Sequence, residues 1–208
     1  MPDLQAFAVF LVAALLVAVT PGPGIFYVAA RTLAGGRAEG IASSFGTGIG
    51  GLVHVAAGTL GVSALIMASA EAFTALKLAG ALYLIWLGFK TWRDAWITGP
   101  LGIETTGAAR AFREGILVEA LNPKTAVFFL AFIPQFIYPA GHVAQQFIVL
   151  GLISVALNTV ADVVVAYGAA KARDGLVHRP TLIARLRQAS AAIMCTLGVG
   201  LLLTRRTA

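Results

Sequence analysis

The chain has 208 residues, a net charge of +6 and 12% charged residues, and its mean hydropathy is +0.87. Soluble domains contain roughly 25% charged residues, so this composition excludes an ordinary soluble domain and predicts an integral membrane protein. The positive charge does not indicate nucleic-acid binding, because the basic residues cluster at the ends of apolar segments, where they orient a membrane protein.

Apolar segments follow one another along the sequence, and each is a candidate membrane-spanning helix. At about 1.5 Å per residue, roughly 18 apolar residues or more cross about 30 Å of hydrocarbon. No Lys or Arg precedes Arg31, so the first segment lacks the basic start of a cleaved signal peptide and is expected to remain a span. We expect an all-α fold of one polytopic domain, residues 1–208, with six spans at residues 4–30, 41–68, 73–92, 114–137, 143–170 and 189–204.

The basic residues predict how these spans are oriented. With the amino terminus outside, three basic residues lie outside, Lys77, Arg205 and Arg206, and Lys124 lies within a span. The other eleven are then cytoplasmic: Arg31, Arg37, Lys90, Arg93, Arg110, Arg113, Lys171, Arg173, Arg179, Arg185 and Arg187. The positive-inside rule therefore places both termini outside.

The first span is interrupted by Thr20-Pro21-Gly22-Pro23-Gly24. Proline breaks a helix and releases carbonyls at membrane depth, where such groups are tolerated if they line a cavity or meet a ligand. We expect the carbonyls around Pro21 and Pro23 to receive a substrate ammonium. Gly22 and Gly24 would let the backbone approach it closely.

The second span contains His54 and several glycines. An imidazole titrates near neutral pH, which suits a proton relay, but a lone histidine in an apolar helix equally serves in packing or hydrogen bonding. Gly46 and Gly50 have a small-xxx-small spacing. This spacing favours close helix packing within one subunit and also permits a homo-oligomer.

Residues 93–113 form the only long polar connection in the middle of the sequence and divide it into three spans plus three. When a unit with an odd number of spans is repeated, its two copies cross the membrane in opposite orientations. This layout therefore predicts the inverted repeat with broken helices that many secondary transporters share.

The fourth span is interrupted at Asn122-Pro123-Lys124. The first two residues suit the N-cap and first position of a restarted half-helix, whose free amides favour a substrate carboxylate. Lys124 would add a positive charge there, and a structural kink without a ligand is the alternative. Glu119, close to the inner boundary, is expected to snorkel or to pair with Arg110 or Arg113.

The fifth span contains Asp162, and an intramembrane carboxylate normally faces a partner or an aqueous path. We expect it to bind a proton or a substrate ammonium; an ion pair with Lys124 is the alternative and can coexist with that role. Asn158 lies one turn earlier, where a packing hydrogen bond is the simpler role, and Tyr167 lies five residues later. Counted from the inner boundary, Asp162 and both proline breaks lie at a depth of roughly 10 to 15 Å, so they could share one site.

Three motifs stand in a characteristic order: Thr20-Pro21-Gly22-Pro23-Gly24, then Lys77-Leu78-Ala79-Gly80-Ala81-Leu82-Tyr83-Leu84-Ile85-Trp86-Leu87-Gly88, then Asn122-Pro123-Lys124 with Phe132-Ile133-Pro134-Gln135-Phe136. Together they resemble the lysine exporter (LysE) superfamily, specifically its homoserine/threonine resistance (RhtB) branch, over nearly the whole chain. The resemblance implies a bacterial inner-membrane exporter of amino acids or their derivatives, driven by proton antiport. Its partners would be a small amino acid, protons and the lipid bilayer, with no cofactor and no metal.

Other functions are compatible with single features of the sequence. Metal efflux would require soft or imidazole ligands, and Cys195 and His54 are the only Cys and His within the expected spans. An intramembrane enzyme would require an activated nucleophile, and no Gly-x-Ser-x-Gly motif frames a serine. A passive channel fits the same composition.

Overall fold

Helices account for nearly all of the described chain. In the computed structural model, which describes residues 4–68, 70–93, 105–171 and 180–203, they are α1 (Leu4–Val19), α2 (Pro23–Ala68), α3 (Ala70–Arg93), α4 (Ala108–Ala120), α5 (Pro123–Val127), α6 (Val143–Lys171) and α8 (Pro180–Leu203). A π-helical segment, Phe128–Phe132, and a 3-10 turn, Ile133–Phe136, continue α5. No strand occurs among these residues, and the all-α class is confirmed.

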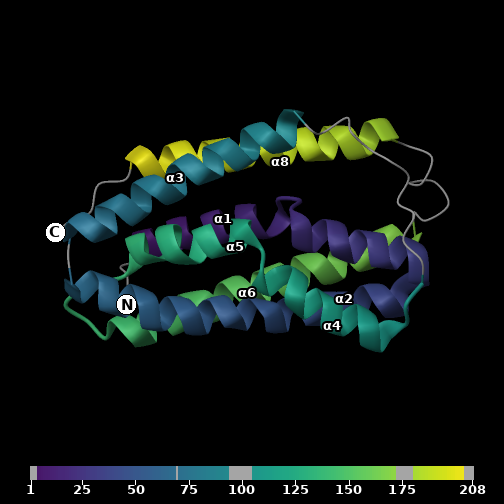
Figure 1. The fold of residues 1–208 in the computed structure, drawn as a ribbon, viewed down its shortest axis with the longest axis horizontal. Coiled ribbons are helices and arrows are strands. Elements are labelled where there is room, and N and C mark those ends of the chain that lie inside the picture. The colour runs from purple at the N-terminus through teal and green to yellow at the C-terminus, as the bar shows by residue number, and fades with distance from the viewer. Residues whose placement is uncertain (1–3, 69, 94–104, 172–179, 204–208) are drawn as a thin grey trace.

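The helices lie in three layers (Figure 1). The helices α3 and α8 pack together on one side, and α1, α5 and the first part of α2 lie in the middle. The part of α2 after Gly36 packs with α4 and α6 on the other side. Each half of the sequence supplies a broken helix followed by two further helices. Corresponding helices of the halves contact each other, α2 with α6 and α3 with α8.

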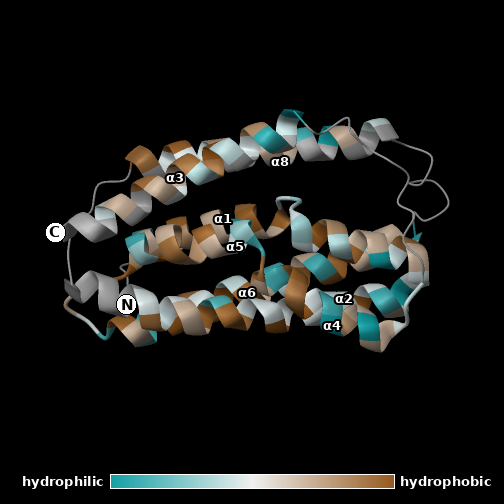
Figure 2. Cartoon of the chain, viewed as in Figure 1, coloured by the Kyte–Doolittle hydropathy of each residue, from teal (hydrophilic) through white to brown (hydrophobic). Residues whose placement is uncertain are grey.

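The lengths of the helices decide which of them can cross a bilayer. Among the described residues, Pro23–Gly61 and Val143–Lys171 are long and apolar enough. A third span results if Ala108–Ala120 and Pro123–Phe136, bent by 43° relative to each other, count as one. Hydrophobic residues cover most of the helices, and hydrophilic ones gather around the start of α4 (Figure 2). The protein is thus a membrane protein by its helices, while the six-span layout stays a prediction.

The helix boundaries differ from the expected ones in two places. The first expected span, 4–30, consists of α1 and the start of α2, and α2 continues where a loop was expected. It changes direction at Gly36, whose φ of 77° is accessible to glycine at little cost. The sixth expected span, 189–204, is the longer helix α8. Residues 94–104 of the central connection, residues 172–179 and both chain ends lie outside the described residues.

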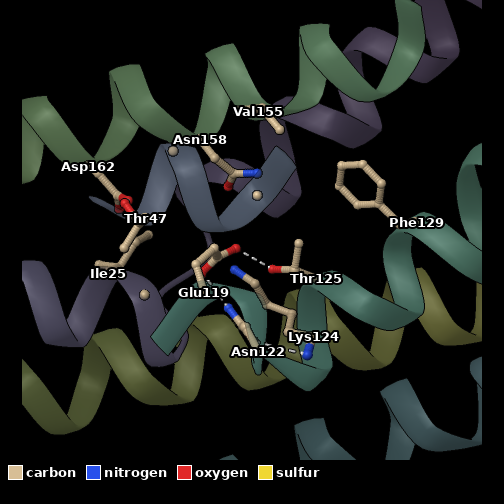
Figure 3. Close-up of a pocket in the computed structure, with 13 residues that line it drawn as sticks. Ile25, Thr47, Glu119, Asn122, Lys124, Thr125, Phe129, Val155, Asn158 and Asp162 are labelled. Atoms are coloured by element: carbon tan, nitrogen blue, oxygen red, sulfur yellow. Dashed lines mark hydrogen bonds between the residues drawn. The ribbon is translucent and has the colours of Figure 1, made fainter. Parts of the chain in front are cut away.

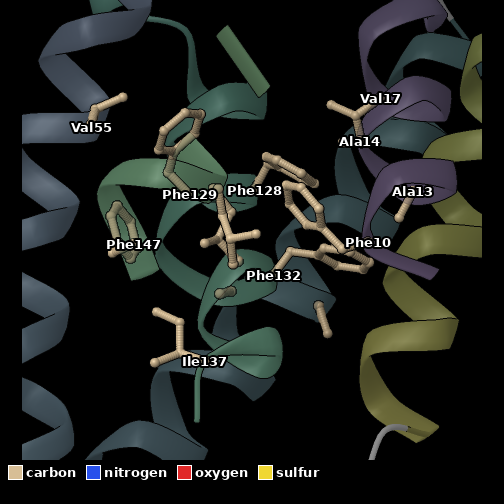
Figure 4. Packing of buried hydrophobic residues seen from close by; sticks show 14 residues of the cluster. Phe10, Ala13, Ala14, Val17, Val55, Phe128, Phe129, Phe132, Ile137 and Phe147 are labelled. Atoms are coloured by element: carbon tan, nitrogen blue, oxygen red, sulfur yellow. The ribbon is translucent and has the colours of Figure 1, made fainter. Parts of the chain in front are cut away.

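An aromatic core holds α1, the π-helical segment and α6 together (Figure 4). Phe10 of α1 meets Phe136 edge to face at 5.6 Å between ring centroids, and Phe129 lies 6.2 Å from Phe147 of α6. Lipid is as apolar as these rings, so close packing rather than transfer out of water stabilises the contacts. The core thereby fixes the start of α5 beside the end of α1, and the two helix breaks lie next to each other.

Candidate functional site

The first helix break separates α1 from α2. The helix α1 ends at Val19, and the Thr20 amide is the last to bond its carbonyls, Leu16 O at 3.0 Å and Val17 O at 3.3 Å, because no helical turn follows. The ammonium of Lys124 donates hydrogen bonds to two carbonyl oxygens there, Val17 O at 3.1 Å and Thr20 O at 2.9 Å. The carbonyls expected to receive a substrate ammonium are therefore bound by a lysine of the second break.

The second helix break separates α4 from α5. Asn122 is the N-cap and Pro123 the first residue of α5, as the sequence predicted. The Asn122 Oδ1 atom accepts a hydrogen bond from the Lys124 amide at 3.1 Å. Because the Asn122 side chain already binds the Lys124 amide, this amide is not open to a substrate carboxylate in this conformation.

Glu119 is buried at the second break, with 7% of its surface exposed. Its Oε2 atom accepts a hydrogen bond from Asn122 Nδ2 at 2.8 Å, and its Oε1 atom accepts one from Thr125 Oγ1 at 2.6 Å. The expectation that Glu119 snorkels or pairs with Arg110 or Arg113 is wrong. A carboxylate at this depth is held by the donors that the helix break supplies.

Glycines make room for the Glu119 side chain. A Cβ atom built on Gly24 would lie 2.6 Å from Glu119 Oε2, and one built on Gly50 would lie 2.9 Å from Glu119 Cβ. The glycines of the first motif and of the second span therefore allow α2 to pack directly on this carboxylate.

His54 of α2 contacts the same residue through the backbone. Its Nε2 atom lies 2.8 Å from Glu119 O, and because a carbonyl only accepts, this nitrogen carries the hydrogen. The ring centroid lies 5.7 Å from that of Phe129. His54 thus has a hydrogen-bonding role at the end of α4, and it does not line the pocket described below.

Asp162 of α6 is buried, and its Oδ2 atom accepts a hydrogen bond from Thr47 Oγ1 of α2 at 2.7 Å. Among the described residues, no basic side chain pairs with Asp162 within 4.0 Å. The ion pair with Lys124 is therefore absent, because the two carbonyls of the first break hold that ammonium.

These groups converge on one pocket between the helices (Figure 3). Gly24 and Ile25 line it from the first break. Its polar lining comes from the second break and from both long helices: Thr47, Glu119, Asn122, Lys124, Thr125, Asn158 and Asp162. Two carboxylates and one ammonium thus surround a space that admits about one water molecule. This shared lining agrees with the equal depth calculated from the sequence.

Six residues named from the sequence lie outside this pocket: Pro21, Gly22, Pro23, His54, Pro123 and Tyr167. Tyr167 is 44% exposed, with the Arg37 guanidinium 5.5 Å above its ring. Pro21 and Pro23 shape the first break without lining the pocket, whereas Gly24 lines it. Gly22 packs against the Lys124 side chain, to which a Cβ atom would come within 3.2 Å.

The hydroxyls of Thr47 and Thr125 were missed from the sequence. Thr and Ser in apolar helices usually bond the carbonyl of the preceding turn, as Thr32 does with Val28, so their presence alone marks no site. Of the two, only Thr125 could have been noted as a site residue from the sequence, because it directly follows the Asn122-Pro123-Lys124 break.

A second charged cluster ties the first part of α2 to α4. Arg31 pairs with Glu114, and Arg110 contacts the other oxygen of the same carboxylate at 2.7 Å. The Tyr27 hydroxyl donates to Ala111 O at 2.8 Å. These contacts hold the two helices together beyond the pocket.

Buried ionisable groups between broken membrane helices are the arrangement of a membrane transport protein. The family model described as "LysE type translocator" matches residues 15–205, and the chain belongs to this family. The resemblance seen in the sequence motifs is confirmed, and the protein is a translocator rather than an enzyme.

Named relatives support this membership. The chain is 34% identical over 157 residues to the homoserine/homoserine lactone efflux protein of Salmonella typhimurium, covering 73% of this chain and 74% of the relative. It is 30% identical over 137 residues to the leucine efflux protein of Klebsiella pneumoniae, covering 63% of each. It is 32% identical over 206 residues, 97% of each chain, to an uncharacterized membrane protein of Vibrio cholerae. No solved structure matches it.

Proposed function

We propose that this translocator exports an amino acid or a small amino-acid derivative across the bacterial inner membrane in exchange for protons. The observation that carries the proposal is the pocket where both helix breaks meet and where Glu119 and Asp162 lie buried. The relatives named for homoserine and leucine efflux support the substrate class.

The hydrogen bonds around the pocket favour the ammonium as the substrate group that is recognised. The positive groups are already bound, since the Lys124 ammonium contacts two carbonyls and its amide contacts Asn122. Glu119 accepts two side-chain hydrogen bonds, whereas Asp162 accepts one. Asp162 therefore keeps the larger acceptor capacity for a substrate ammonium.

Proton exchange follows if one carboxylate serves both cations in turn. Ionised Asp162 binds the substrate ammonium from the cytoplasm. A proton from outside then neutralises Asp162 and releases the ammonium outward, and loss of that proton to the cytoplasm resets the site. Because the pocket admits about one water molecule, binding requires it to widen, and broken helices are the elements that move in such transporters.

Uptake into inside-out membrane vesicles tests this proposal. With an imposed pH gradient, we expect accumulation of radiolabelled homoserine, threonine or leucine, which an uncoupler abolishes. Asp162→Asn should abolish accumulation while the protein remains in the membrane. Normal gradient-driven uptake by Asp162→Asn would refute the assigned role, and equilibration without accumulation would indicate a passive channel.

Metal efflux within the same superfamily has no supporting donor set here. Within residues 4–68, 70–93, 105–171 and 180–203, no group of three or more His, Cys, Asp or Glu side chains is placed to hold a metal ion. Soft or imidazole ligands are what such a pathway requires. No observation favours this alternative over amino-acid export.

We also propose the six-span inverted repeat with both termini outside. The pairing of α2 with α6 and of α3 with α8 supports a relation between the halves. Reporter fusions after Arg37, near Gly107 and after Arg179 should then report cytoplasm, and fusions near Gly141 and after Arg206 should report the outside. A cytoplasmic carboxyl terminus would refute this topology.

A further inference from the structure

The hydroxyl of Thr47 has two close neighbours but only one hydrogen. Thr47 is 3% exposed, and its Oγ1 atom lies 2.7 Å from Asp162 Oδ2 and 2.8 Å from the carbonyl oxygen of Ser44. The Ser44 carbonyl only accepts hydrogen bonds. With ionised Asp162 the two acceptors compete for the single Thr47 hydrogen, whereas two full hydrogen bonds form at the same time when Asp162 carries a proton and donates it to Thr47.

Two hydrogen-bond arrangements fit this single set of heavy-atom positions. When Asp162 is protonated, its hydroxyl donates to Thr47 Oγ1, and Thr47 donates to Ser44 O. When Asp162 is ionised, the Thr47 hydroxyl rotates and donates to Asp162 Oδ2 instead. Hydroxyl rotation is enough to change from one arrangement to the other, since a threonine hydroxyl both donates and accepts.

We propose that Thr47 is the positioning residue for the proton that Asp162 exchanges, acting as acceptor to the protonated acid and donor to the carboxylate. In both states it holds Oδ2, which leaves Oδ1 as the oxygen for a substrate ammonium. This inference rests on the proposed exchange of protons for an amino acid and names the residue that holds Asp162 in both charge states.

The other charged groups that face Asp162 are held separately. Glu119 of α4 and Lys124 of α5 are the ionisable side chains that share its pocket among the described residues. Glu119 is bound by Asn122 and Thr125, and Lys124 is bound by the carbonyls of the first break. A change at Thr47 therefore alters the surroundings of Asp162 while these contacts stay in place.

Thr47→Val tests the proposal, because it keeps the shape of the side chain and removes the hydroxyl. A hydrogen bond donated to an ionised carboxylate is stronger than one accepted from a neutral acid, so the loss disfavours the ionised form. In inside-out vesicles, the medium pH at which homoserine uptake is half-maximal should rise by about one unit. Thr47→Ser restores the hydroxyl and should keep the midpoint of the unmodified protein.

Thr59→Val is the matched control. Thr59 lies on the same helix and donates to Val55 O at 2.6 Å, and it has no hydrogen bond to a carboxylate of the described residues. In Thr59→Val, the medium pH at which homoserine uptake is half-maximal should stay that of the unmodified protein. An unchanged midpoint in Thr47→Val, a shifted one in Thr47→Ser, or an equal shift in Thr59→Val would each overturn the proposal.

Infrared titration of the purified protein supplies a readout independent of transport. The carboxylic-acid carbonyl band of Asp162, identified by its loss in Asp162→Asn, should persist to higher pH in Thr47→Val and in the smaller Thr47→Ala. An unshifted band in a folded variant would overturn the role of Thr47. If the unmodified protein accumulates none of the three amino acids, the proposed function fails, whereas the infrared result still decides the role of Thr47.

Discussion

The two helix breaks satisfy their backbone groups in different ways. At the second break, Asn122 binds the Lys124 amide two residues away, and Glu119 is bound by Asn122 and Thr125 nearby. At the first break, the Val17 and Thr20 carbonyls are bound by Lys124, more than 100 residues along the chain. The second break is therefore built from its own sequence, whereas the first depends on the second.

This difference matters because water is absent at membrane depth. Each unsatisfied backbone group costs several kcal/mol in hydrocarbon. A break with polar side chains beside it supplies partners locally. Beside the Pro-Gly-Pro break, the Thr20 hydroxyl binds Leu16 O at 2.5 Å, and the Thr20 carbonyl is left to Lys124. Substitutions at the second break should consequently also destabilise the first break, and the following variants test that dependence.

Lys124→Met should have the largest effect. It leaves the Thr20 carbonyl without its lysine donor and the Val17 carbonyl with only the Thr20 amide at 3.3 Å, and unsatisfied buried groups cost about 1 to 3 kcal/mol each. We expect a loss of stability of at least about 2 kcal/mol, visible as a lower melting temperature in detergent and a lower level in the membrane. Lys171→Met, at the exposed end of α6, is the control. Equal melting temperatures for the two variants would show that the first break does not need Lys124.

Glu119→Gln should have the second largest effect, lowering the free energy of unfolding by about 2 kcal/mol. The variant keeps the shape but loses the charge and one of the two acceptors that serve Asn122 and Thr125. A double-mutant cycle with Thr125→Val measures the shared bond, and the two effects should be non-additive by about 1 kcal/mol. Additive effects in thermal unfolding would mean that the Glu119–Thr125 contact contributes nothing.

Replacing both Asn122 and Pro123 with alanine should lower the free energy of unfolding by about 1 to 2 kcal/mol, because the N-cap and the Asn122 donor to Glu119 are both lost. The helix can then continue through the second break with its own hydrogen bonds. The protein should stay folded, and amino-acid uptake into vesicles should be lost. Pro139→Ala, at an exposed position after the 3-10 turn, is the control. Undiminished uptake by the double variant would show that the break is only a kink.

His54→Gln should have the smallest effect, within about 0.5 kcal/mol, because the glutamine amide can donate to Glu119 O in place of the imidazole. The pH dependence of uptake should stay that of the unmodified protein. The pH profile is the decisive measurement, and a shifted midpoint in a normally folded His54→Gln variant would assign a proton relay to His54 after all.

Much of the framework could be predicted from the sequence. The apolar segments indicated membrane helices, the prolines marked both breaks, and Asn122 and Pro123 were assigned correctly as N-cap and first helical residue. These features depend on interactions within a few residues, namely the missing proline donor and the asparagine acceptor. The prediction that Asp162 and the two breaks could share one site was made from helical rise, and Gly24, Asn122 and Asp162 line one pocket.

The partners of the long-range buried side chains were decided only by the tertiary structure. An ion pair between Lys124 and Asp162 was the alternative that the sequence left open, but the packing of α1 against the second break gave Lys124 two carbonyl partners instead. Glu119 was expected to snorkel or to pair with Arg110 or Arg113, and it is held by Asn122 and Thr125 close by because the helix breaks there. Thr47 became significant through Asp162, which is 115 residues away. Such contacts depend on how helices pack, and packing is set by glycines and rings across the whole molecule rather than by the neighbours of each residue.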